Sequence, residues 1–319
     1  MISFLFQSVR IGMALLFGST GETLTEKAGH LNLGIPGVMC VGAACGCVTA
    51  SKMIETFGDV YEKGFFLSLL TVVLCILATL AGGAIMGLIY SFLTVTLRAN
   101  QNVTGLAMTT FGVGVSDVMI ANVNSFSLAS KCFTAHLPFA DKLGGFGKLF
   151  LSYGVLVYIA IAVAIAVSLV LKRTKLGLHL RAVGENPATA DAAGINVTAY
   201  RYGATCVGCA IAGLGGFTYI IDYLGGNWEY VIDAMGWLAV ALVIFTIWNP
   251  EIGIVGSIAF GALYIASSYV TGISLSTKEF FKMLPYVVTI IVLVITSIRN
   301  KRENQPPASL GLNYFREER

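Results

Sequence analysis

Residues 65–97 read FFLSLLTVVLCILATLAGGAIMGLIYSFLTVTL, and this stretch decides the fold because it contains no charged side chain. About 20 apolar residues are enough for a helix to cross the hydrocarbon core of a bilayer, which is about 30 Å thick. As a single helix the run would be roughly 50 Å long, at about 1.5 Å per residue. We therefore expect a membrane-spanning helix that tilts, protrudes, or breaks at Gly82 and Gly83.

The same character extends over the whole chain of 319 residues. Apolar residues make up 56%, charged residues only 12%, and the mean hydropathy is +0.80, whereas soluble domains contain about 25% charged residues. The runs are long and do not show the alternation of outer-membrane strands, so helices should span the bilayer. The sequence predicts an all-α polytopic membrane protein, a single transmembrane domain over residues 1–319, with about eight to ten spans. The candidate spans are 4–20, 34–50, 65–97, 101–121, 151–171, 200–221, 232–248, 252–271 and 283–298.

The basic residues give a prediction of orientation. If the loops that contain Arg98, residues 172–201 and residues 299–319 are cytoplasmic, that side holds 12 Lys and Arg residues and the outer side holds seven. This asymmetry agrees with the positive-inside rule, and it predicts a cytoplasmic C-terminal tail and an outer N-terminus. The net charge of +3 forms no clustered basic face, so no nucleic-acid partner is expected.

Several catalytic signatures are missing from the sequence. No GxxxxGK[ST] motif occurs, and GGFGKL at 144–149 has the wrong spacing for a phosphate-binding loop. Cys206 and Cys209 have the CxxC spacing, but they lack a second pair or a nearby histidine, and free cysteines packed in helices are commoner. None of the three histidines lies in a candidate span, and there is no HExxH motif or serine elbow. We therefore expect no metal site and a transport subunit instead of an enzyme.

The loop at 172–201, KRTKLGLHLRAVGENPATADAAGINVTAYR, carries the signals of a short helix outside the membrane. Asn186 is a good N-cap, Pro187 suits the first helical position, and Gly194 fits the residue just past the end. A helix of about two turns is marginal in water. It must either pack on its own transmembrane helices or dock into a groove on another protein, and the residues alone leave both open.

Four stretches, in the same order along the chain, resemble permeases of ABC importers of the nucleoside and simple-sugar type. They are GETLTEKAGHLNLGIPGVMCVGA at 21–43, GLHLRAVGENPATADAAGINV at 177–197, GWLAVALVIFTIWNPEIGIVGSIAFGALY at 236–264, and PASLGLNYFREER at 307–319. The resemblance implies alternating access in a bacterial cell membrane, with nucleosides as the expected solute. Simple sugars and branched-chain amino acids are the alternatives.

The same resemblance implies partners and a coupling site. The partners are a separate ATP-binding subunit that uses ATP and Mg²⁺, a second permease subunit in a heterodimer, and an extracellular substrate-binding protein; this chain itself holds no cofactor. Physically, Gly184 would let the chain turn into the short helix, and Arg181 or Glu185 could make a charge-assisted bond to the partner. The residues that map onto the coupling loop are Arg181, Gly184, Glu185, Asn186, Ala193 and Gly194.

A route for a small polar solute should show broken helices and uncharged hydrogen-bonding side chains. Two places qualify: Asn32 in the opening of the second span, and Gln101, Asn102 and Thr104 in RANQNVTG. Helix capping is the alternative for each, and it is the favoured one for Asn102. Pro36 stands where the permeases that this chain resembles more often have an acidic residue. Whatever role that acidic residue has in them cannot be assigned to Pro36.

Charge within the spans separates two kinds of transporter. Among the acidic residues only Asp117 lies clearly inside a candidate span, where it could face the pathway or pair with another subunit; Arg10 lies in the first run, and Asp222 and Asp233 lie near span ends. The scarcity of such charges favours a neutral solute, and it disfavours an ion-coupled carrier or channel, which usually places ionisable groups at membrane depth. Phe111, Trp237 or Tyr264 could stack on a nucleobase, although aromatic residues near span ends are commonly interfacial anchors.

Overall fold

The computed structural model describes residues 2–121, 123, 126–135, 147, 150–229, 232–270, 272, 275–299 and 305–315. Within these ranges the chain is helical and contains no strand. Seven of the described helices are long and apolar enough to cross a membrane. The prediction of an all-α multi-pass membrane protein is therefore confirmed.

The seven long helices cover seven of the nine runs expected from the sequence. They are α1 (Ile2–Lys27), α2 (Ile35–Phe57), α3 (Phe65–Ser91), α4 (Gln101–Ile120), α7 (Val155–Arg173), α10 (Val197–Thr218) and α12 (Pro250–Tyr269), with π-helical turns η1 (Phe92–Thr96) and η3 (Tyr219–Tyr223) continuing α3 and α10. The other two runs form α11 (Ile232–Phe245) and α13 (Leu275–Arg299), whose apolar parts are shorter. The described residues also include the short helices α5 (Ser127–Thr134), α8 (Lys175–Glu185) and α9 (Pro187–Ala192).

The expected break of the third span at Gly82 and Gly83 is wrong, because α3 runs through both residues without interruption. A β-carbon on Gly83 would overlap the backbone of Cys209 in α10, and one on Gly82 would overlap the Cys45 side chain of α2. The two glycines therefore allow three helices to approach closely. The excess length continues into the π-helical turn η1.

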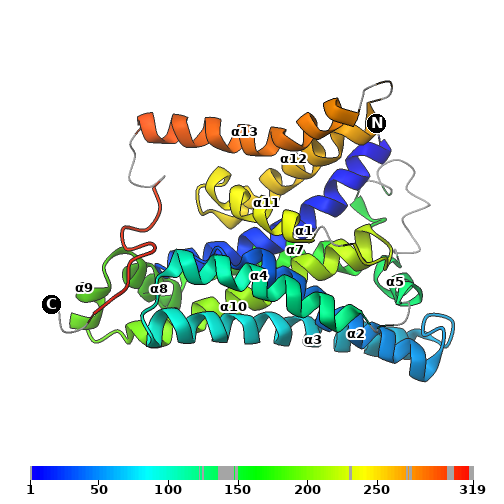
Figure 1. Ribbon diagram of the computed structural model, residues 1–319, viewed down its shortest axis with the longest axis horizontal. Helices are drawn as coiled ribbons and strands as arrows, with labels where there is room; N and C mark the ends of the chain where they lie inside the picture. Colours follow the sequence, from blue (N-terminus) through cyan, green and yellow to red (C-terminus); the bar gives the residue numbers. More distant parts are fainter. Residues whose placement is uncertain are drawn as a thin grey trace.

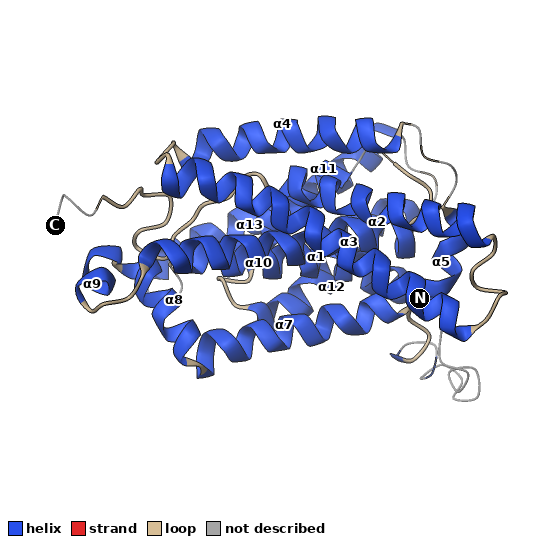
Figure 2. Cartoon of the chain, turned by 90° about the horizontal axis from the view of Figure 1, so that it is seen from below, coloured by secondary structure: helices blue, strands red, loops and turns tan. Residues whose placement is uncertain are grey.

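The centre of the bundle is formed by α1, α2 and α10, which lie side by side in Figure 2. Backbones meet at glycines: a β-carbon on Gly21 would overlap the Gly208 carbonyl, and one on Gly216 would overlap the Met39 carbonyl. Small residues at such crossings stabilise helix packing where lipid gives no hydrophobic driving force between helices. A buried ion pair adds to this packing, since the Arg10 side chain of α1 contacts the Asp222 carboxylate of η3 at 2.9 Å.

The two chain ends lie at opposite ends of the bundle (Figure 1). One end carries α8, α9 and residues 305–315; we call it the coupling end. The other carries the N-terminus, α5 and the connection from α2 to α3, where Lys131 pairs with Asp59 at 2.9 Å. Basic residues expected on one side, such as Arg98 and those of 172–201, gather at the coupling end, as the sequence predicts. That this end is cytoplasmic stays a prediction.

Candidate coupling and translocation site

The predicted short helix at 186–194 is confirmed as α9. The Asn186 Oδ1 accepts a hydrogen bond from the Thr189 amide at 3.0 Å, and Pro187 occupies the first turn. Gly194 ends the helix with a φ of +83°, which an L side chain rarely adopts. The Ile195 amide closes the turn on the Ala190 carbonyl at 3.0 Å.

Helix α8, directly before α9, was not expected from the sequence. Thr174 caps it by accepting from the Gly177 amide at 3.1 Å, and its buried residues Gly177, Leu180, Val183 and Gly184 recur at helical spacing. That spacing after a Thr cap is the signal that could have located it. The predicted turn at Gly184 is wrong: the residue is helical, and a β-carbon there would overlap the Lys27 carbonyl at the end of α1.

The pair α8–α9 both packs on its own chain and presents an outer face. Val183, Ala190 and Val197 form a small buried cluster that joins α8 and α9 to α10. The remaining residues of the predicted coupling set point away from this cluster and are exposed. They are Arg181, Glu185, Asn186, Ala193 and Gly194. Packing on the chain's own helices is therefore confirmed, and docking of the exposed face on another protein stays a prediction.

The helix break expected near Asn32 is confirmed in residues 28–34, which we call the inner segment. Gly29 has a φ of +84°, and the Asn32 Oδ1 accepts from the Gly34 amide at 2.9 Å. Pro36 lies in the first turn of α2, where its missing donor costs little. The inner segment thus leaves α1 and enters α2 through a non-helical turn at the coupling end.

The first span is longer than expected, because α1 continues beyond residue 20 to Lys27, and both Glu22 and Glu26 are buried in it. The Glu22 Oε1 accepts the Asn32 amide at 3.2 Å, and Trp248 Nε1 donates to Glu26 Oε2. Asp117 is accordingly not the only acid within a span. A carboxylate from α1 thus bonds the inner segment, which the sequence alone could not show.

His30 is fully buried in the inner segment. Its Nδ1 lies 3.0 Å from the Thr205 hydroxyl of α10. Burial, together with the nearby Arg201 guanidinium, lowers the pKa of His30 to about 3, so the imidazole is neutral at physiological pH. Neutral His30 acts here as a hydrogen-bonding group that ties the segment to α10.

Three of the four predicted pathway residues meet at this break. Asn32 is buried in the inner segment, and Gln101 and Thr104 are buried one turn apart in α4. The Gln101 Oε1 accepts from the Leu31 amide at 2.9 Å. Asn102 is exposed and does not cap α4, since Asn100 accepts from the Val103 amide. Contact of these residues with a solute stays a prediction.

A third break, which sequence reasoning missed, precedes α11. Gly225 and Gly226 have φ values of +66° and +81°, and α11 has 14 residues, about 21 Å of helix against a core of about 30 Å. The Gly-Gly pair before an unusually short apolar run was the available signal. A cavity of about 40 Å³ beside this break is lined by Ser116, Asp117, Glu229 and Asp233, among others.

A larger cavity of about 630 Å³ lies between α11 and α13 and shares Asp233 with the smaller one. Trp237 and Tyr286 contribute aromatic rings, and Thr289 contributes a hydroxyl. No lysine or arginine lines either cavity among the described residues. The two cavities share Asp233 beside α11: carboxylates line the smaller one, and mainly aromatic and aliphatic side chains line the larger one.

This combination, a multi-pass helical bundle with a capped helix pair seated against a broken span, defines a permease of the ABC-importer type. The chain belongs to the family described as branched-chain amino acid transport system / permease component, which matches residues 4–293.

Three relatives illustrate the similarity. The nucleoside ABC transporter permease protein NupC of Lactococcus lactis is 32% identical over 88% of each chain. The guanosine ABC transporter permease protein NupQ of Bacillus subtilis is 28% identical over 88% of this chain and 87% of its own. The putative glucose ABC transporter permease protein TsgC13 of Haloferax volcanii is 28% identical over 97% and 96%. No solved structure matches the chain.

Proposed function

We propose that this chain is the permease of an ATP-driven nucleoside importer in a bacterial cell membrane, working by alternating access. The observation that carries the proposal is the position of α8–α9. The pair exposes Arg181 and Glu185 outward, while Gly184 lies directly against the end of α1 where the inner segment begins. A force applied to the exposed face therefore acts next to a break in the membrane-spanning helices.

The partner at this face is a separate ATP-binding subunit, which supplies the chemistry of ATP and Mg²⁺. Arg181, Glu185 and Asn186 offer charged and polar groups to it, and Ala193 and Gly194 offer a surface without bulky side chains. A second permease subunit and an extracellular binding protein complete the importer. The family description, a permease component of a transport system, supports an assembly of several subunits.

The solute would pass along α11. A nucleoside carries ribose hydroxyls that donate to carboxylates and a base that stacks on aromatic rings, and the two cavities provide Asp117, Glu229 and Asp233 followed by Trp237 and Tyr286. At the coupling end, Asn32, Gln101 and Thr104 would hold the inner segment across the route. Asn102 faces outward, where it would meet a neighbouring subunit or lipid.

A simple sugar is the second candidate, because it shares the hydroxyl chemistry and one relative is named for glucose. A branched-chain amino acid is disfavoured, since its carboxylate would find no lysine or arginine among the described residues that line the route. The names of the two nucleoside-type relatives favour nucleosides over sugars.

The experiment is uptake by the assembled importer in vesicles, with radiolabelled uridine, guanosine, ribose, glucose and leucine supplied separately. We expect saturable uptake of uridine or guanosine that an excess of unlabelled nucleoside, but not of sugar, abolishes. Uptake of leucine or of a sugar without any nucleoside would contradict the proposal. A Glu185→Lys variant serves as the coupling control, because it should reach the membrane yet lose the stimulation of ATP hydrolysis.

A further inference from the structure

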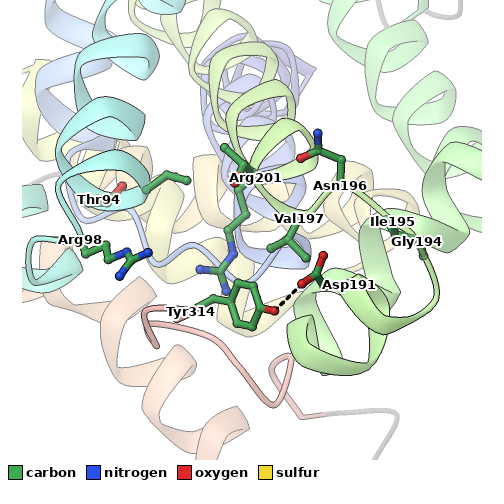
Figure 3. Close-up of a pocket in the computed structure, with 11 residues that line it drawn as sticks. Thr94, Arg98, Asp191, Gly194, Ile195, Asn196, Val197, Arg201 and Tyr314 are labelled. Atoms are coloured by element: carbon green, nitrogen blue, oxygen red, sulfur yellow. Dashed lines mark hydrogen bonds between the residues drawn. The ribbon is translucent and has the colours of Figure 1, made fainter. Parts of the chain in front are cut away.

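The C-terminal segment 307–315, which we call the strap, lies across the coupling end without regular secondary structure. It is attached to both coupling helices. The Ser309 amide donates to the Gly184 carbonyl of α8 at 3.0 Å, and the Tyr314 hydroxyl donates to Asp191 Oδ2 of α9 at 2.8 Å (Figure 3). Ser309 is buried, so the strap is packed into the fold and not laid on its surface.

The same strap is attached to the inner segment. The Gly311 amide donates to the Gly29 carbonyl at 3.3 Å. The Leu312 carbonyl accepts from Gln101 Nε2 and from Arg201 Nη1, each at 3.3 Å. Gln101 in turn accepts from the Leu31 amide, so one buried side chain joins the strap, α4 and the inner segment.

A third attachment reaches the connection between η1 and α4. Asn313 Nδ2 donates to the Arg98 carbonyl at 2.7 Å, and the Arg98 guanidinium lies 4.8 Å from the centre of the Phe315 ring. Most of these bonds use main-chain groups on one side or both. The strap is therefore held by main-chain groups of the helices and segments around it, and it should move when they move.

A cleft lies between α9 and η1, and the strap borders it. The cleft has a volume of about 410 Å³ and is lined by Thr94 and Arg98 on one side, by Asp191 and Asn196 on the other, and by Tyr314 of the strap. Figure 3 shows these side chains around the space, with the Tyr314 ring between the two walls. Two connections join α9 to η1 around this cleft: α10, which contacts both elements, and the strap, which bonds Asp191 of α9 and the Arg98 carbonyl just after η1.

We propose that the strap transmits movement of α8–α9 to the inner segment and α4, with Gln101 as the positioning residue that holds the strap to both. The use of this linkage in ATP-driven transport rests on the proposed function. The linkage itself is a property of this chain: it predicts that loosening the strap loosens residues 28–34 even when the permease is alone.

The first test is hydrogen exchange of the isolated full-length permease in detergent. Ser309→Pro removes the amide that bonds Gly184, Tyr314→Phe removes only the hydroxyl that bonds Asp191, and Gln101→Met removes the three-way junction. Leu312→Ala is the matched control, because that side chain is 61% exposed and only its carbonyl is bonded. We expect exchange of residues 28–34 to accelerate about tenfold in Ser309→Pro and Gln101→Met, with Leu312→Ala within twofold of the wild type. Unchanged exchange in Ser309→Pro would overturn the proposal even if Gln101→Met accelerates it, because Gln101 also bonds the Leu31 amide directly. If Ser309→Pro does not fold, Tyr314→Phe decides: faster exchange of residues 28–34 supports the linkage and unchanged exchange overturns it.

The second test compares uptake with ATP hydrolysis in the assembled importer. We expect Tyr314→Phe to lower solute uptake per ATP at least fivefold while ATP hydrolysis stays within twofold of the wild type. A merely structural strap would lower both together, and that result, or an unchanged ratio, would refute the linkage. If the wild-type importer moves no nucleoside, the proposed function fails, but the exchange test still decides the linkage.

Discussion

Removing the cap of α9 is the perturbation whose consequence follows most directly from the structure. In Asn186→Ala the Thr189 amide loses the acceptor that now lies 3.0 Å away. Asn186 is exposed, so its replacement leaves no cavity, and the change is confined to the cap. Loss of an Asn cap costs about 1 kcal/mol within a range of about 0.5–2 kcal/mol.

This magnitude is large for a helix of six residues. Such a helix has too few hydrogen bonds to repay nucleation by itself, so α9 depends on its cap and on the buried Ala190 contact with Val183 and Val197. A cost of about 1 kcal/mol shifts the ratio of folded to frayed α9 about fivefold. We therefore expect the Thr189 and Ala190 amides to exchange about fivefold faster in Asn186→Ala.

The assay pairs this exchange measurement with the stimulated rate of ATP hydrolysis in the assembled importer. That rate should decrease by a similar factor, about fivefold. Asn186→Asp is the matched control, because a carboxylate caps a helix as well as the amide does; both quantities should stay within twofold. If Asn186→Ala accelerates exchange and leaves stimulation unchanged, α9 is not where the ATP-binding subunit is coupled. If exchange itself is unchanged, the capping argument is wrong.

Three further predictions concern packing, charge and the route. Gly216→Ala forces a β-carbon onto a carbonyl of α2 and should destabilise the permease by about 1–3 kcal/mol, which a lower Tm in detergent would show. The control is Gly203→Ala in the same helix, α10: a β-carbon there meets no atom within 4 Å, so the Tm should not decrease. Asp222→Asn removes the carboxylate paired with Arg10, although the Asp222 carbonyl and Gln7 still accept from the guanidinium. The change should cost at most about 3–5 kcal/mol and more than replacing both residues with apolar ones, a difference that denaturant titration measures. Trp237→Ala should raise the KM for nucleoside uptake about two- to tenfold, with Trp237→Phe close to the wild type.

Local signals in the sequence located most of the fold and part of the site. Apolar run length located the spans, and the Asn, Pro and Gly at 186, 187 and 194 located α9 to within a residue, because caps act on neighbouring amides only. The same locality explains the break at Asn32. These features do not depend on what the rest of the chain does.

Features set by distant parts of the chain were missed or misjudged. Gly82 and Gly83 look like helix breakers until α2 is known to pack against the first and α10 against the second. Glu22 looks like an exposed loop residue until the Asn32 amide is found at its carboxylate. The attachments of the strap join residues more than 100 positions apart, which no local pattern in one sequence encodes.

The most direct test of the account is nucleoside uptake driven by ATP alone. Inside proteoliposomes that contain this permease with its ATP-binding subunit and second permease, ATP and Mg²⁺ are enclosed, and radiolabelled uridine or guanosine is added outside with the binding protein. We predict uptake that requires enclosed ATP, persists when ionophores collapse all ion gradients, and disappears in a Glu185→Lys permease. Uptake that follows an imposed ion gradient and proceeds without ATP would contradict the account.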